Sequence, residues 1–176
     1  FLTNKTEIPE VMEVTKRPDD KLNFGGVWHS DTSYLKSPSM GALLYAVETP
    51  KIGGDTVFSN MYKVFDSLSH GMQAFLSNLS AVNISNKAND QDIRPKSNSV
   101  PLKASHPVIR THPETKRKLL YVNEAHTVNF VGMSQAESKP LLEFLFQRIK
   151  EERFSYRYTW KPGSVAFWDN RACQHF

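Results

Sequence analysis

Two histidines and one aspartate are the residues of this sequence best suited to bind a transition metal. His29 and Asp31 stand two positions apart in the triplet HSD, and on a β-strand such side chains point to the same face. An imidazole and a carboxylate arranged in this way can contact one ion. The triplet alone is weak evidence, because a surface histidine beside a turn aspartate gives the same pattern.

His175 completes a set of three candidate ligands, far along the chain from His29 and at the end of a predicted strand at 164–168. Two histidines and one carboxylate form a facial triad, which leaves half of an octahedral coordination sphere for a chelating co-substrate and dioxygen. This arrangement is typical of non-haem iron(II) oxygenases, whereas a structural zinc site is closed by four ligands. The sequence therefore predicts that His29, Asp31 and His175 are metal ligands and catalytic residues.

The elements that must position these residues are short strands and two helical regions. Apolar or alternating patterns predict a buried strand at 41–49 and further strands at 56–59, 108–111, 119–122, 154–160 and 164–168. Apolar residues at helical spacing predict a helix at 61–79, with a break near Ser69–Gly71, and a second helix after the capping box Ser134–Glu137. This pattern predicts a mainly β fold with helical insertions and a jelly-roll core.

The stretch between Asn83 and Ser105 is mostly polar and predicts a long loop. Loops of this length in compact domains often cover an active site, so a lid over the metal is one interpretation. Plain disorder is the other, and the pattern favours neither.

Composition and charge narrow the class of protein. The chain has 176 residues and an excess of four positive charges, but these are spread out, and the run Lys116–Lys118 reads as a hairpin tip, so we expect no nucleic acid partner. The longest apolar run, at 42–47, is far shorter than the roughly 20 residues of a membrane span, so we expect no membrane partner. The single cysteine, Cys173, excludes an internal disulfide and favours the cytoplasm.

Four sequence blocks carry a resemblance to a known family. They are WHSDTSY at 28–34, GGDTVFSNMY at 53–62, HPVIRTHPETKRKLLYVNEAHT at 106–127 and PGSVAFWDNRACQH at 162–175. In this order they resemble the taurine dioxygenase family. The resemblance implies a double-stranded β-helix (jelly-roll) core, iron(II), and 2-oxoglutarate and O2 as co-substrates, with release of succinate and CO2.

The resemblance also assigns roles to individual residues. His29, Asp31 and His175 match the family's iron ligands, and Thr56 matches the threonine whose hydroxyl contacts a carboxylate of 2-oxoglutarate. A threonine after Gly-Gly-Asp could equally be a residue that starts a strand.

The sequence departs from the family pattern in three respects. The arginine that pairs with the far carboxylate of 2-oxoglutarate is expected beyond Phe176, and the N-terminal part is short, so we expect residues 1–176 to form a single but incomplete dioxygenase domain. His126 replaces a phenylalanine of taurine-oxidising members. An imidazole can donate a hydrogen bond or carry charge, so His126 is predicted to bind substrate, the alternative being a partly exposed strand residue.

The resulting hypothesis is a 2-oxoglutarate-dependent hydroxylase of a small, anionic, sulfonate-like organic molecule. We expect a homo-oligomer. The alternative is a non-catalytic jelly-roll module that holds a metal for structure, which would bind zinc tightly in a closed site. A metal-dependent hydrolase with the same three ligands is the third interpretation.

Overall fold

The computed structural model describes residues 2–3, 11–17, 19–20, 25–85 and 100–176. The chain divides into two compact units, residues 1–26 with 88–99 and residues 27–87 with 100–176. In the first unit, β1 (Leu2–Thr3) pairs with β2 (Glu13–Val14). The second unit contains every candidate site residue.

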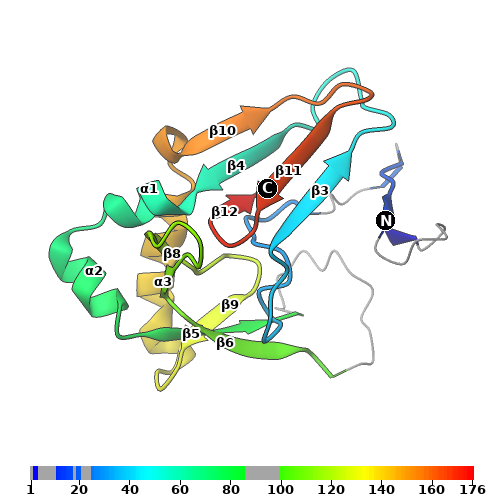
Figure 1. The fold of residues 1–176 in the computed structure, drawn as a ribbon. Helices are drawn as coiled ribbons and strands as arrows, with labels where there is room; N and C mark the ends of the chain where they lie inside the picture. The colour runs from blue at the N-terminus through cyan, green and yellow to red at the C-terminus, as the bar shows by residue number, and fades with distance from the viewer. Residues whose placement is uncertain (1, 4–10, 18, 21–24, 86–99) are drawn as a thin grey trace. The chain divides into compact units, whose positions relative to one another are not determined.

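The second unit is built mainly from short antiparallel strands (Figure 1). They are β3 (Gly41–Tyr45), β4 (Thr56–Asn60), β5 (Ser80–Ile84), β6 (Lys103–Pro107), β7 (Ile109–Thr111), β8 (Lys118–Leu120), β9 (Thr127–Phe130), β10 (Ser155–Tyr158), β11 (Val165–Asp169) and β12 (Cys173–His175). The strand orders are β10-β4-β12 and β6-β5-β9, with two-stranded ladders of β11 with β3 and of β7 with β8. The fold is thus mostly β with few helices, as predicted.

The helices are α1 (Met61–Asp66), α2 (His70–Leu76), α3 (Gln135–Ile149) and the 3-10 helix η1 (Glu152–Phe154). The predicted break in the first helical region is confirmed, because the Ser69 side chain accepts a hydrogen bond from the Met72 N–H and caps α2. The predicted capping box of Ser134 and Glu137 is also present. No helix in the described part of the chain is long and apolar enough to cross a membrane.

The hydrophobic core lies between α1, α3 and the strands β8 and β9. The buried stripe of α3 contains Leu142, Leu145, Phe146 and Ile149, and it packs against α1 and β9. Figure 1 shows the opposite end of the unit formed by β4, β10, β11 and β3, so the sheet that carries His175 extends away from this core. His175 pairs with Phe58, close to the end of β4 that leads into α1, so the candidate site lies where this sheet meets the core.

The ladder of β3 with β11 contradicts the prediction of a buried strand at 41–49. Leu43 pairs with Phe167 and Tyr45 with Val165, and the exposed fractions of Leu43 and Phe167 are 65% and 66%. An apolar run shows that a strand can be buried, but it does not say whether another layer of the same chain covers it.

The predicted loop between Asn83 and Ser105 was wrong at both ends, which belong to β5 and β6. Asn83 is 1% exposed, and its side-chain oxygen accepts a hydrogen bond of 2.8 Å from the Thr127 hydroxyl. The polar side chain of Asn83 is therefore part of a buried hydrogen bond and not of a solvated loop. Residues 86–99, which include most of the proposed lid, lie outside the described residues.

Candidate metal centre

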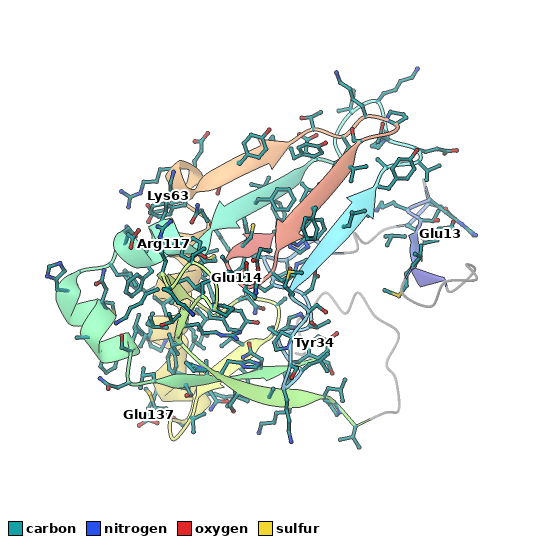
Figure 2. The ribbon with its side chains drawn as sticks, viewed as in Figure 1. Glu13, Tyr34, Lys63, Glu114, Arg117 and Glu137 are labelled. Atoms are coloured by element: carbon teal, nitrogen blue, oxygen red, sulfur yellow. The ribbon has the colours of Figure 1, made fainter. Side chains whose placement is uncertain are left out.

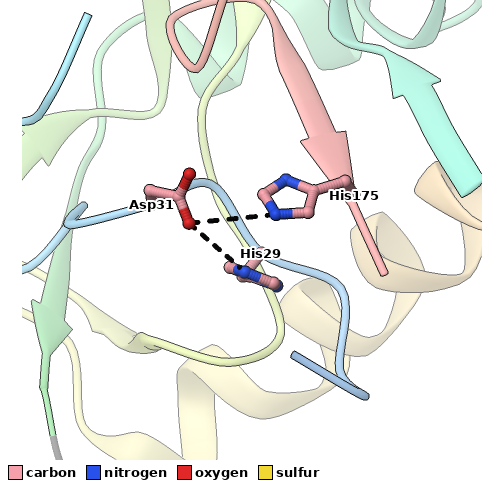
Figure 3. A group of neighbouring side chains, drawn as sticks. All are labelled: His29, Asp31 and His175. Carbon is pink, nitrogen blue, oxygen red and sulfur yellow. Dashed lines mark ion pairs between the residues drawn. The ribbon is translucent and has the colours of Figure 1, made fainter. Parts of the chain in front are cut away.

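The three predicted ligands converge on one point of the second unit (Figure 3). Oδ1 of Asp31 lies 3.4 Å from Nε2 of His29 and 3.8 Å from Nε2 of His175. One ligand atom from each residue lies within 4.8 Å of the other two. Small side-chain rotations would bring all three atoms to a single ion.

A backbone bridge joins the two distant histidines. The His29 N–H donates to the His175 carbonyl at 3.0 Å, and the His175 N–H donates back to the His29 carbonyl at 2.9 Å. His175 belongs to β12, which pairs with β4 so that His175 lies opposite Phe58. The bridge thereby attaches the HSD triplet to the edge of the β10-β4-β12 sheet.

Two details of the sequence-based geometry were wrong. Asp31 does not follow His29 along a strand, because the chain turns directly after the bridge and Thr32 adopts a φ of 53°. His175 does not end the strand at 164–168 either, since a turn at 170–172 separates β11 from β12. A turn, and not strand alternation, therefore brings the Asp31 carboxylate beside the imidazoles.

The His29 ring is oriented by a hydrogen bond to the backbone. Nδ1 lies 2.7 Å from the Val27 carbonyl oxygen, which can only accept, so Nδ1 carries the proton. Nε2 then keeps its lone pair and faces Asp31. Metal-binding histidines commonly have their second nitrogen held in this way.

The His175 ring is held by packing. It contacts the rings of Trp168 and Phe58 at centroid distances of 4.8 Å and 6.0 Å. Its Nδ1 is buried and has no hydrogen-bond partner among the described residues. Burial, together with the neighbouring His29 imidazole, lowers the pKa of His175 to about 3, so the ring is neutral at neutral pH and able to act as a ligand.

Asp31 supplies the negative charge of the site. Burial by itself raises the pKa of Asp31, but the interactions with His29, His175 and the Asn170 side chain outweigh it and lower the pKa below the usual value. A carboxylate and two imidazoles form a donor set that suits a divalent transition metal. The residues present therefore fit iron(II).

The HSD segment, residues 27–31, is attached to the turn between β11 and β12. The Asn170 side-chain oxygen accepts hydrogen bonds from the Asp31 N–H at 3.4 Å and from Nε1 of Trp168 at 3.0 Å. The Ser30 hydroxyl donates to the Cys173 carbonyl at 3.1 Å. Asn170 is 1% exposed, so this attachment is inside the protein.

The turn itself is held by a charged network that was not predicted from the sequence, although its residues lie within two of the four sequence blocks. Nε and Nη2 of Arg171 donate to Asp169 at 2.7–3.1 Å, and Nη1 donates to Glu114 at 2.9 Å. Nε2 of the buried His112 lies 3.0 Å from Oδ2 of Asp169, and its Nδ1 accepts from the backbone N–H groups of Glu114 and Thr115. Figure 2 labels Glu114 on the loop between β7 and β8.

This network stabilises the charged form of Asp169. Burial alone would raise the pKa of Asp169, but the hydrogen bonds from Arg171 and His112 lower the pKa to about 2. His112 and Arg171 had no assigned role from sequence. In the sequence, Asp169 and Arg171 stand two positions apart and could have been predicted to pair. This spacing does not indicate that His112 joins them.

Thr56 lies on the same face of β4 as the metal centre. Phe58 is opposite His175, and Thr56 precedes Phe58 by two positions, so both side chains point to this face. Two strand residues span roughly 6.6 Å. Thr56 is therefore about two strand residues away from the position opposite His175, at a distance that a small molecule bound beside His175 could span.

His126 borders the site from a turn directly before β9. Its ring contacts Tyr34 edge to face at a centroid distance of 4.9 Å and lies 6.4 Å from the His29 ring. It is 9% exposed, so the alternative of a partly exposed strand residue was wrong. Tyr34, labelled in Figure 2, was also missed, although it belongs to the first sequence block.

Comparison with known proteins identifies the family. The family model for "Taurine catabolism dioxygenase TauD, TfdA family" matches residues 1–176. An alpha-ketoglutarate-dependent sulfonate dioxygenase of Saccharomyces cerevisiae is 36% identical over 170 residues, 95% of this chain and 41% of the relative. An alpha-ketoglutarate-dependent 2,4-dichlorophenoxyacetate dioxygenase of Cupriavidus pinatubonensis is 32% identical over 158 residues, 87% of this chain and 55% of the relative.

Solved structures lead to the same family. The crystal structure of a taurine dioxygenase from Burkholderia xenovorans matches with a TM-score of 0.74 and 34% identity, covering 88% of this chain and 51% of that one. The chain thus spans about half the length of the relatives it matches. With the family model matched from end to end and the four sequence blocks in order, the chain belongs to the TauD, TfdA family of taurine catabolism dioxygenases.

Proposed function

We propose that the protein is an iron(II)- and 2-oxoglutarate-dependent dioxygenase that hydroxylates a small organic anion and releases succinate and CO2. The observation that carries the proposal is the convergence of two imidazole nitrogens and one carboxylate, from segments at opposite ends of the sequence. The dioxygenase relatives named above support the reaction class.

The metal would be held by Nε2 of His29, Nε2 of His175 and Oδ1 of Asp31. Three protein ligands leave coordination positions for the keto acid of 2-oxoglutarate and for O2. Iron(II), when bound, supplies the activation of O2 that amino-acid side chains lack. The side chains contribute neutral donors, one negative charge and fixed orientations.

Thr56 would bind the 2-oxoglutarate carboxylate that lies away from the metal. Its hydroxyl is a donor on the same face of the sheet as the three ligands, at a distance along β4 that suits a five-carbon diacid. A hydrogen bond to a charged group contributes about 1.5–3 kcal/mol. Part of the affinity for the co-substrate would come from this contact.

His126 would bind the substrate, with Tyr34 beside it. The named substrates of the relatives include a sulfonate and 2,4-dichlorophenoxyacetate, both organic anions. An imidazole can donate a hydrogen bond to such a group, and a tyrosine ring adds an apolar wall with a polar end. These features favour a sulfonate-like or carboxylate-bearing substrate.

The proposal extends to the architecture and setting of the protein. We infer a jelly-roll core within a single dioxygenase domain, supported by the antiparallel ladders and by the fold match to a taurine dioxygenase. A homo-oligomer remains a proposal. So does a cytoplasmic location, which the single cysteine favours.

The test is O2-dependent release of succinate from the full-length protein, loaded anaerobically with iron(II) and given 2-oxoglutarate. The substrate panel should contain alkyl sulfonates, aryloxyacetates and alkyl sulfates, with a His29→Ala variant as the control. Succinate formation that depends on one of these anions is expected. A protein that makes no succinate and holds zinc with four ligands would instead be the non-catalytic binding module.

A further inference from the structure

A tryptophan donates a hydrogen bond to the threonine proposed to bind 2-oxoglutarate. Nε1 of Trp160 lies 2.9 Å from Oγ1 of Thr56, although the two residues are far apart in sequence. Trp160 follows β10, in which Tyr158 pairs with Thr56 in the ladder. The Trp160 ring packs edge to face against Tyr158 at a centroid distance of 4.7 Å, so the neighbouring strand holds the indole over Thr56.

The chemistry of the two groups fixes the direction of the hydrogen bond. An indole N–H can only donate, so the Thr56 oxygen must accept. The hydroxyl has a single proton, and the structure gives it no acceptor among the described residues. The proton is therefore available for a ligand, and the bond from Trp160 restricts the orientations it can take.

We propose that Trp160 is a positioning residue that directs the Thr56 hydroxyl proton toward a carboxylate of 2-oxoglutarate. The inference rests on the proposed function, which assigns that carboxylate to Thr56. A donor on the hydroxyl oxygen also polarises the O–H bond and strengthens the hydrogen bond that it donates. Trp160 would thus act through Thr56, without contact to the co-substrate.

Without the indole N–H, the hydroxyl has other choices. A threonine on a strand can rotate its side chain and bond to nearby backbone groups. Each orientation that faces away from the ligand reduces the fraction of molecules ready to bind it. The cost would therefore appear in the affinity for 2-oxoglutarate and not in the affinity for the metal.

The test is a double-mutant cycle on the full-length protein loaded with Mn(II), with the dissociation constant for 2-oxoglutarate measured by calorimetry. Trp160→Phe keeps an aromatic ring and removes the donor, and Thr56→Val removes the hydroxyl. We expect Trp160→Phe to weaken 2-oxoglutarate about 3- to 10-fold, and the double variant to bind no worse than Thr56→Val alone. Tyr156→Phe, an exposed change on β10, should leave the constant unchanged.

A purely structural role of Trp160 predicts a different result, because its effect would then multiply with that of Thr56→Val. Multiplying effects, or an unchanged constant in Trp160→Phe, would overturn the inference. If Trp160→Phe folds poorly, 3-benzothienylalanine at position 160 keeps the ring shape without the N–H and gives the same comparison. A wild-type protein that binds Mn(II) but not 2-oxoglutarate would defeat the proposed function itself.

Discussion

The two segments that supply the proposed metal ligands differ in how they are held. The HSD segment is irregular, and its hydrogen bonds run outward to His175, Asn170 and Cys173. The segment from β11 through β12 is held by its own turn, by the Asp169–Arg171 ion pair and by pairing with β4. The second segment is therefore a platform on which the first is oriented.

This difference predicts which substitutions reduce both stability and metal affinity and which reduce metal affinity alone. A substitution in the turn of the platform loosens the groups to which the HSD segment is bonded, so it should reduce both stability and metal affinity. Replacing the Asp31 side chain leaves the backbone bridge of His29 with His175 and the bond of Ser30 to Cys173 in place. Its effect should therefore remain mainly at the metal.

The largest effect is expected from Asp31→Ala, which should abolish iron(II) binding because two imidazoles alone cannot hold the ion or balance its charge. The free energy of unfolding of the metal-free protein should change little. Metal analysis after dialysis and denaturant unfolding measure the two quantities. The control is Asp66→Ala, since Asp66 is exposed and pairs with the exposed Arg117. Iron retained by Asp31→Ala would remove this residue from the centre.

Arg171→Ala should affect both properties and so separates the platform from the HSD segment. It leaves Asp169 with His112 as its remaining side-chain partner, and we expect the free energy of unfolding to fall by about 2 kcal/mol. Iron(II) affinity should fall by roughly 10-fold, as for other groups that support ligands. An unchanged metal affinity beside reduced stability would show that the turn does not support the site.

The pH dependence of the free energy of unfolding below about pH 4 tests whether Arg171 stabilises the turn through Asp169. The pKa of Asp169 is lowered from 3.8 to about 2 in the folded protein, so its contribution is complete above the unfolded pKa and is lost as the pH falls from 3.8 toward 2. The stability difference between wild type and Arg171→Ala should therefore be largest above about pH 4 and narrow toward pH 2. A difference that stays constant over this range would show that Arg171 does not act through Asp169.

Thr56→Val tests a position outside both segments. The requirement for 2-oxoglutarate should rise at least about 10-fold, because a hydrogen bond to a charged group contributes about 1.5–3 kcal/mol. Iron(II) affinity should be unchanged, because Thr56 is not a ligand. Steady-state rates at varied 2-oxoglutarate, together with metal titration, give both values. An equal loss of metal affinity would mean that the hydroxyl supports the fold of the site instead.

Ser30→Ala should give the smallest effect. It removes one hydrogen bond from the HSD segment to the Cys173 carbonyl, and we expect a loss of about 1 kcal/mol in the free energy of unfolding. The metal should still bind, since the bridge between His29 and His175 and the contact of Asp31 with Asn170 remain. Complete loss of iron in this variant would show that the orientation of the segment depends on this one bond.

The sequence was informative where chemistry depends on residue type. The three proposed ligands could be identified from their side chains and the family resemblance, and the N-cap Ser69 and the capping box at Ser134 indicated where two helices start. The turn that presents Asp31 could not be predicted, because it depends on a bridge to a residue at the far end of the chain.

Burial was the property least accessible to prediction. Leu43 and Asn83 illustrate this in opposite directions, since the apolar residue is exposed and the polar one is buried. Each outcome depends on which other segment lies against the strand. His112 was likewise unassigned, because its partner Asp169 comes from another part of the chain. Local patterns report the capacity of a residue, whereas tertiary contacts decide how it is used.

The most direct test of the account is anaerobic titration of iron(II) into the wild-type protein and into His29→Ala and His175→Ala. We expect one iron per chain in the wild type and none in either variant, with folded structure retained by circular dichroism. Iron bound at the same stoichiometry in both variants would contradict it, because the two histidines would then not share an ion.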